Sequence, residues 1–470
     1  MWYNTGMKIL KKILLTILVV VGAIIAVVFL INLIDEKLNP LMYTEKDLSP
    51  ASSDKSNGFY ILWGLAEPEE IDPQSDEYAR SIQDKLNNKY IDTFEKGFFD
   101  SKAYRSLFND YSAAIDKIKI PQLFSDKWIS SLISQAQTLD QVAQACALPL
   151  KRYNRLIDTP VFEDFTPPKI NSPIPNIIAW LKILRLFSVI ETLDALHGNW
   201  EKAANRLLDN IDFSEKVGKG SRMWIIFHLS NNTALWSLSA LMNIMNHPDC
   251  PPSIHNLVFN RLSSIKPRKN VLKNILISEC LSSCSVLDNF ETYKNIEDQS
   301  IFFRILPQDF LLQTNATKNY FYDSFSKFMS MESLQPFQWK TTNADELASK
   351  MPNKKFLWWI QNPVGKTIYM MTMPHFHSPA TSYYRTRAYL SLTRIIAELH
   401  LKDTGQGEIL PILQTLDSYK AIDPFSGKPF LWNNSTQRLY SIGQNFKDEK
   451  GAGDINQVGD DLSEIYKRKN

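Results

Sequence analysis

This chain has few glycines and a net charge close to zero. The first feature argues against a protein of many short strands, and the second argues against a nucleic-acid-binding protein. Only 16 of the 470 residues are glycine, whereas a protein built from many short strands needs glycine at its tight turns. The formal net charge is +2, and charged residues make up 22% of the chain. Such a balance leaves no electrostatic footprint for nucleic acid. With 44% hydrophobic residues, the composition is that of an ordered, mainly helical protein.

Cysteines and the common catalytic motifs are also sparse. The cysteines form no Cys-x-x-Cys pair, which argues against a zinc or thioredoxin-like site. The sequence leaves open whether they are buried thiols or paired in disulfides. A nucleophile elbow, a His-Glu-x-x-His motif and a dinucleotide-binding glycine pattern are absent, so we assign no catalytic residue. The four cysteines are Cys146, Cys250, Cys280 and Cys284.

Three fragments contain pieces of known sites, and each has a simpler interpretation. Gly365–Thr367 matches the end of a phosphate-binding loop, but the required upstream glycine is missing. His375 and His377 could form two metal ligands, yet no third ligand lies nearby in the sequence. His247 and Cys250 are close enough for nucleophilic catalysis, but the prolines around them favour a loop between helices.

A long apolar run near the N-terminus is the strongest single feature of the sequence. Residues Ile13–Ile34 include no charged side chain, and as a helix they would cover roughly 33 Å, enough to cross a bilayer. Lysines precede the run and acidic residues follow it, which predicts a cytoplasmic N-terminus. A cleaved signal peptide fits less well, because the run continues well beyond the small residues around Ala23. We therefore expect a single-pass protein of the bacterial inner membrane with a periplasmic, extracytoplasmic body.

The remainder of the chain divides into regions of different character. The middle is helical by its apolar spacing. It includes Glu279, a carboxylate among apolar neighbours that we interpret as bonding to an adjacent helix. The expected regions are an anchor with its cytoplasmic tip (1–36), a spacer and N-terminal helical segment (37–120), a helical core (121–290), an irregular aromatic-rich wrapping segment (291–382) and a C-terminal module (383–470).

Two consecutive segments of the core predict an αα-hairpin. Residues 176–196 and those that follow Trp200 each have an apolar face, and Gly198 between them suits a left-handed helix end. The pair is similar to one tetratricopeptide hairpin, but no 34-residue recurrence supports a repeat array. The expected fold class is therefore mainly α: a helical bundle with αα-hairpins, plus a small C-terminal α+β module of one helix and a β-meander.

The C-terminal module resembles the C-terminal part of the major pseudopilins of type II secretion systems. The resemblance rests on Asp423-Pro424-Phe425 with nearby Gly427 and Pro429, on residues 440–443 and on an acidic loop, and it covers about 90 residues. The chain as a whole also resembles uncharacterised bacterial membrane-anchored proteins. It departs from a pilin subunit, because some 350 residues separate the N-terminal helix from this module and no processing site precedes that helix.

The pseudopilin resemblance implies a calcium site. In those proteins the loop holds Ca²⁺ between carboxylates and backbone carbonyls, in keeping with the preference of this ion for oxygen ligands. A simply solvated Asp/Gly-rich loop is the alternative. The residues implied here are Asp448, Asp460 and Asp461, with carbonyls near Ser441 and Gly443.

From the sequence we expect a non-catalytic scaffold or interaction protein of the cell envelope that binds another envelope protein. The alternative is an envelope hydrolase acting on cell-wall or secreted substrates, with a site that no motif reveals. Nucleic acid is not an expected partner.

Overall fold

The structure of the protein is a computed structural model. The structure describes residues 35–40, 43–48, 54, 56–67, 69, 71–87, 110–125, 127–169, 172–266, 270–288, 312–331, 334–339, 361–372, 377–403, 405, 408–451 and 462–467, together with 16, 17, 19, 20, 23, 27, 28 and 30–32 of the N-terminal helix.

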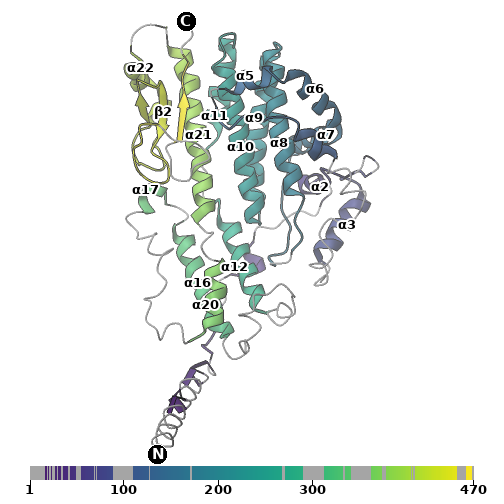
Figure 1. Ribbon diagram of the computed structural model, residues 1–470, viewed down its shortest axis with the longest axis vertical. Helices are drawn as coiled ribbons and strands as arrows, with labels where there is room; N and C mark the ends of the chain where they lie inside the picture. The colour runs from purple at the N-terminus through teal and green to yellow at the C-terminus, as the bar shows by residue number, and fades with distance from the viewer. Residues whose placement is uncertain are drawn as a thin grey trace, which may run out of the picture.

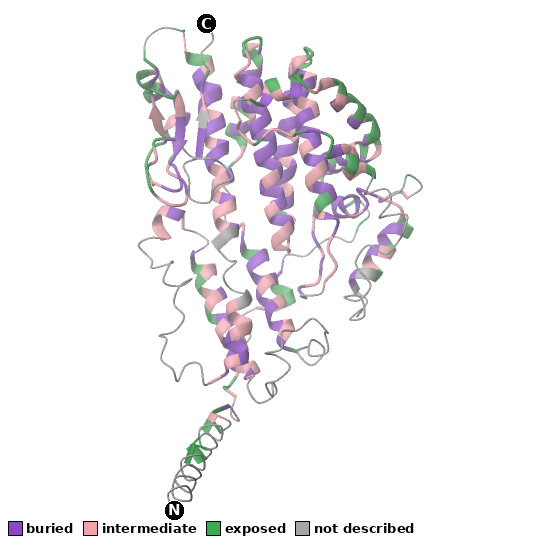
Figure 2. Cartoon of the chain, viewed as in Figure 1, coloured by how far each residue is buried: buried purple, intermediate pink, exposed green. Residues whose placement is uncertain are grey.

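Five long helices form an upper bundle that contains the larger hydrophobic core (Figure 1). The helix at its centre, α10, packs against all four of the others, and most of its residues are buried (Figure 2). Its sequence is apolar on every side, as expected for a helix surrounded by protein. The five are α8 (Ile177–Leu196), α9 (Trp200–Gly220), α10 (Trp224–Met245), α11 (Pro252–Ser264) and α21 (His377–Lys402).

The predicted αα-hairpin is confirmed by α8 and α9. Asn176 caps α8, because its side chain accepts a hydrogen bond from the backbone N–H of Ala179. Gly198 follows α8 with a φ of 97°, the left-handed conformation in which glycine is favoured. The two helices then pack along each other.

Shorter helices cover one flank of the upper bundle (Figure 1). Arg152 holds this flank together, since its buried guanidinium donates to the carbonyls of Gly64 at 2.9 Å and Ile71 at 2.6 Å. The flanking helices are α2 (Gly58–Trp63), α3 (Asp76–Asn87), α5 (Trp128–Ile133), α6 (Ala136–Ala145) and α7 (Ala147–Asp158).

A lower bundle with its own hydrophobic core lies beneath the first (Figure 1). Helix α21 belongs to both, because Tyr383 near its start is part of the lower core and Leu392 part of the upper one. The region 291–382, expected to be irregular, contributes helices here. The lower elements are η1 (Glu45–Asp47), α12 (Lys273–Asp288), α16 (Thr314–Met331), α17 (Pro336–Trp339) and α20 (Pro363–Thr372).

The C-terminal module packs on the side of α21 and confirms the predicted fold class, mainly α with a small meander. Its three strands pair in the order β1-β2-β3, and both pairings are antiparallel. Asn246, at the end of α10, ties β3 to the bundle: its side chain donates to the carbonyl of Ile465 at 2.9 Å. The elements are α22 (Ile409–Thr415), η5 (Ser418–Lys420), β1 (Leu431–Asn433), β2 (Arg438–Ser441) and β3 (Leu462–Ile465).

The predicted membrane anchor is contradicted. Among the residues that the structure describes, no helix combines the length and the apolar character needed to cross a membrane. This finding overturns the expectation of a transmembrane helix over Ile13–Ile34, and with it the single-pass inner-membrane location and the periplasmic placement of the body. The physical reason lies at the C-terminal end of the apolar run. There the backbone carbonyl of Ile31 accepts a hydrogen bond from Gln313, and the side-chain oxygen of Asn32 accepts one from Asn362. Hydropathy alone cannot predict these contacts with the protein body.

Candidate functional site

A polar cluster joins three segments that are far apart in the sequence, at the base of the lower bundle. It is formed by residues 31, 32 and 35–39, by Gln313–Asn319 at the start of α16, and by Gln361–Lys366 at the start of α20. We call this cluster the joint. The N-terminal helix leaves the body here and points away from it (Figure 1). We call the described residues of that helix, within 16–32, the arm.

Asn362 lies at the centre of the joint and is fully buried. Its backbone N–H donates to Asn32 Oδ1 at 2.7 Å. Its side-chain oxygen accepts from the backbone N–H of Gln313 at 2.8 Å, and its side-chain nitrogen donates to Thr317 Oγ1 at 2.9 Å. One residue therefore connects all three segments. Its φ of 51° is left-handed, a conformation that asparagine tolerates better than most residues.

Asp35 attaches the base of the arm to α16. Its carboxylate accepts from the backbone N–H groups of Asn315 at 2.7 Å and Ala316 at 3.0 Å. These groups belong to the first turn of α16, whose N–H groups have no partner within the helix. The positive end of the helix dipole also favours a carboxylate there. Asp35 thus acts as a helix cap supplied by a segment 280 residues away in sequence.

Asn319 holds the chain that leaves the arm. Its side-chain oxygen accepts from the backbone N–H of Asn39 at 2.9 Å, and its side-chain nitrogen donates to the carbonyl of Lys37 at 3.1 Å. The side-chain amide of Asn319 thus pairs with one backbone donor and one backbone acceptor of this segment, much as a neighbouring β-strand would. Residues 37–39 are thereby fixed along α16.

Gly365 lets α20 approach α16 closely. A Cβ atom at this position would lie 1.9 Å from Thr317 Oγ1 and 2.3 Å from Asn362 Oδ1, far inside van der Waals contact. The glycine that matches a phosphate-binding loop in the sequence therefore has a packing role. Lys366, the next residue of the same fragment, likewise has a structural role, because its amine donates a hydrogen bond to the backbone carbonyl of Gln361.

Lys366 is the buried ionisable group of the joint, with 1% of its surface exposed. Burial lowers the pKa of its amine from 10.5 to about 8, and the nearby Glu36 carboxylate opposes this shift. The folded protein therefore releases this proton at a lower pH than the unfolded chain does.

We predict that Lys366 makes the protein more stable as pH rises from about 8 to 10.5. In that window the unfolded chain binds more protons than the folded one, so the free energy of unfolding rises with pH. The full difference is about 3 kcal/mol. Urea unfolding at several pH values should show this slope in the wild type and its loss in Lys366→Met. Equal slopes in the two proteins would contradict the prediction.

The residues predicted to bind calcium are only partly described. Asp460 and Asp461 lie outside the described residues. Asp448 Oδ1 accepts from the Tyr440 hydroxyl at 3.0 Å. Gly443 has a φ of 64° and donates to Ser441 Oγ. Within the described part of the chain, no three His, Cys, Asp or Glu side chains converge as metal ligands, and the calcium site stays a prediction.

Asp423 is the organising carboxylate of the C-terminal module, a role that the sequence did not reveal. It is buried and accepts from Ser441 Oγ at 2.7 Å and from the backbone N–H of Phe425 at 3.0 Å. Burial raises its pKa, while these hydrogen bonds oppose the shift. Asp423 thus fixes the turn over 423–428 against β2.

We predict that Asp423→Ala destabilises the module by about 2 kcal/mol, because it leaves buried donors without an acceptor. Hydrogen exchange should show faster exchange at the amides of Phe425 and Ser426, and unchanged exchange in α9. Uniform acceleration throughout the protein, or none at all, would contradict this local role.

The other fragments noted in the sequence have structural roles where they are described. His247 and Cys250 lie in the loop between α10 and α11, as expected. Glu279 accepts from the backbone N–H of Trp224 at 3.4 Å, which confirms that it contacts a neighbouring helix. His375 lies outside the described residues, as does the side chain of His377. All four cysteines are free thiols, and each is buried.

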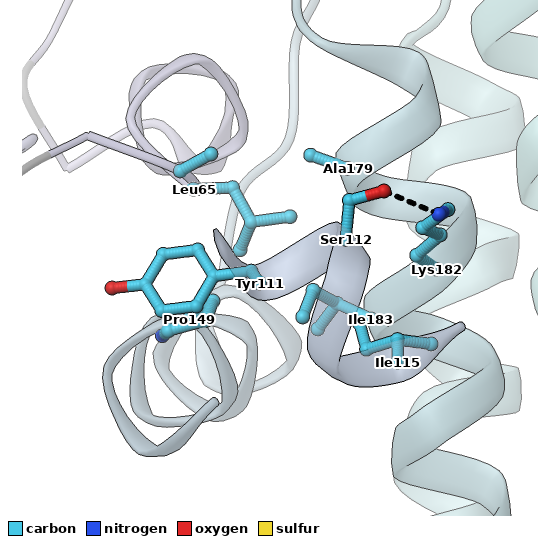
Figure 3. Close-up of a pocket in the computed structure, with 9 residues that line it drawn as sticks. Leu65, Tyr111, Ser112, Ile115, Pro149, Ala179, Lys182 and Ile183 are labelled. Atoms are coloured by element: carbon cyan, nitrogen blue, oxygen red, sulfur yellow. Dashed lines mark hydrogen bonds between the residues drawn. The ribbon is translucent and has the colours of Figure 1, made fainter. Parts of the chain in front are cut away.

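An open pocket on the flank has an apolar lining (Figure 3). It contains about 240 Å³ of empty space, its solvent-filled mouth included, between α7, α8 and residues 110–115. Lys182 is its charged lining residue, and its amine is bound to both carboxylate oxygens of Asp116 at 2.7 and 2.8 Å and to Ser112. The positive charge of Lys182 is therefore neutralised by Asp116 within the protein.

Comparison with protein-family models, curated proteins and solved structures gave no match. The resemblance of the C-terminal module to pseudopilins therefore stays a prediction.

Proposed function

We propose that the protein is a non-catalytic helical scaffold that binds another protein through its N-terminal arm. The joint is the observation that carries this proposal. Buried amides such as Asn362 and Asn319 are costly to desolvate unless every group is paired. Here they are used to connect the arm to two helices that begin about 280 and 330 residues later. Such a cluster is suited to holding the arm in one direction.

The surface of the arm supports the same function. Most of its described aliphatic residues are exposed (Figure 2). An exposed group of apolar side chains marks an interaction site in a folded protein. Its partner would present a complementary apolar surface. The most exposed large apolar side chains are Ile17 at 55%, Val19 at 64%, Val20 at 51%, Val27 at 53% and Leu30 at 62%.

Site-specific photo-crosslinking in the native cell tests this proposal. A photoreactive residue at Val27 should give one discrete protein adduct. The matched control is Ile422, which is equally exposed, at 56% against 53%, but lies in the C-terminal module. Asn362→Ala, which weakens the joint and leaves the arm sequence unchanged, should reduce the adduct from position 27. The proposal fails if both positions give the same adducts, or if the joint variant crosslinks like the wild type.

A further inference from the structure

Two histidines pack against each other where strand β3 meets the upper bundle. His255 of α11 and His400 of α21 have their ring centres 4.4 Å apart, and His255 is only 2% exposed. His400 also packs against Tyr466, with 4.7 Å between the ring centres. Tyr466 comes directly after β3. We call His255 and His400 the imidazole pair, and it connects two helices to the C-terminal strand.

Hydrogen bonds fix where the protons of the imidazole pair lie. The carbonyl of Met245 can only accept, so His255 Nε2, which is 3.0 Å away, carries a hydrogen. Asn246 donates through Nδ2 to the carbonyl of Ile465, which makes its other side-chain atom, Oδ1, an acceptor. His400 Nε2 therefore donates to this Oδ1 at 3.2 Å. Each neutral ring has its hydrogen on Nε2, and a further proton would bind at Nδ1.

The same contacts attach residues 465–467, which we call the strand end, to the bundle. The backbone N–H of Lys467 donates to Asn246 Oδ1 at 3.2 Å, the oxygen that also accepts from the imidazole. The Tyr466 hydroxyl donates to Asp403 Oδ2 at 2.7 Å, and Tyr466 is 3% exposed. The position of the imidazole pair and the attachment of the strand end are therefore linked through shared partners.

Helix α21 brings one carboxylate to the imidazole pair. Asp403 lies one turn after His400 and on the same face, because its N–H still bonds to the helix. Glu398 lies on another face, where it accepts from the backbone N–H of Ser418 at 2.9 Å. Lys402, two residues after His400, also lies away from that face. A carboxylate beside the pair favours one imidazolium.

The other elements around the pair give no such support to a second positive charge. Helix α11 has no charged residue within one turn of His255. On the loop after α10, His247 packs against Trp200 of α9 and lies 3.8 Å from Asp249. Lys467 is exposed and adds positive charge. Two imidazolium rings 4.4 Å apart, one of them buried, would repel each other strongly.

We propose that the imidazole pair is an acid-sensitive latch that releases the strand end from the upper bundle. While the strand end is attached, the two rings are held together and accept one proton between them. Once it is detached, Tyr466 and Asn246 no longer hold His400, whose ring turns into water, and both rings can be protonated. The detached state takes up one more proton from solvent, so acid shifts the equilibrium towards it. A solvated histidine has a pKa of about 6.5, and release begins below that pH.

Hydrogen exchange at the backbone amide of Lys467 tests the latch in the full-length protein, because this N–H donates to Asn246. After correction for the intrinsic effect of pH on exchange, its protection factor should fall about tenfold between pH 6 and pH 5. The amides of α9 are the internal control and should keep their protection. Ordinary carboxyl groups stay largely ionised in this range, so their titration does not produce the effect.

Two matched variants identify the pair as the cause. His255→Phe keeps an aromatic ring but cannot be charged, so the protection of Lys467 should no longer depend on pH between 6 and 5. His247→Phe removes a histidine that faces α9 and should keep the wild-type slope. The slope is compared rather than the level, so a general loss of stability does not imitate the result.

NMR of the histidine side chains in the wild type gives a second measurement, which needs no variant to fold. At pH 5.5 the attached imidazole pair should hold no more than one proton beyond the two on Nε2. The inference is overturned if the protection of Lys467 does not fall in the wild type, if it falls equally in both variants, or if the attached pair is doubly charged.

Discussion

Replacing Asn362 by alanine is expected to lower the free energy of unfolding by about 2–4 kcal/mol. The change removes the acceptor for the buried N–H of Gln313 and the donor to Thr317 Oγ1. It also places alanine at a φ of 51°, which costs roughly 1–2 kcal/mol for a residue that is not glycine or asparagine. Chemical denaturation followed by circular dichroism measures the total.

Two further substitutions separate these contributions. Asn362→Gly relieves the backbone strain but keeps the hydrogen-bond loss, so it should be less harmful than alanine. Asn362→Asp keeps an acceptor for Gln313, but it loses the donor to Thr317 and adds a buried carboxylate, so it should also be destabilising. If all three variants were as stable as the wild type, the side chain of Asn362 would have no structural role in the joint.

Gly220→Ala is expected to destabilise the upper bundle by about 3 kcal/mol or more. A Cβ atom at this position would lie 1.9 Å from the carbonyl oxygen of Phe162. That oxygen belongs to the backbone, so a side-chain rotation cannot relieve the clash. The neighbouring Asp164 would have to move, although its carboxylate accepts from the backbone N–H groups of Arg222 and Met223, just before α10.

Gly218→Ala is the matched control, two residues earlier in the same helix. Its Cβ atom would meet Ser230 Oγ at 3.5 Å, which is an ordinary contact. Because alanine is the better helix former, this substitution should stabilise the protein by up to about 1 kcal/mol. The two alanine variants should therefore shift the thermal midpoint in opposite directions. A similar shift in both would show that close contact at Gly220 does not determine the packing of α9.

The parts of the fold that the sequence predicts are those with local signals. The spacing of apolar residues predicts α8 and α9, and Gly198 predicts the turn between them. The turn residues around Asp423 and Gly427 predict a small β-element near the C-terminus. In each case the cause lies within a few residues of the effect.

The region over 291–382 shows how packing overrides local preference. Its aromatic-rich sequence has modest helix propensity, which favours the irregular structure that we expected. In the folded protein, Phe321 and Phe325 lie four residues apart on α16 and are buried in the lower core with Cys280 of α12. Burial of two phenylalanine side chains, at about 1.5–3 kcal/mol each, outweighs the propensity deficit.

The joint could not be predicted from sequence, because its partners are too far apart. Asp35 and Asn315 are separated by 280 residues, and Asn32 and Asn362 by 330. Neither pair produces a local pattern. The apolar run next to them gave a stronger signal, and it led to the anchor that the structure contradicts.

The most direct test of the account is the distance distribution between the arm and the body. Spin labels are placed at Val27 and at Ile133, two exposed positions, through unnatural amino acids so that the native cysteines stay unchanged. Double electron–electron resonance should give one narrow distribution in the wild type and a broad one in Asn362→Ala. A broad distribution in the wild type, or an equally narrow one in the variant, would show that the joint does not fix the arm.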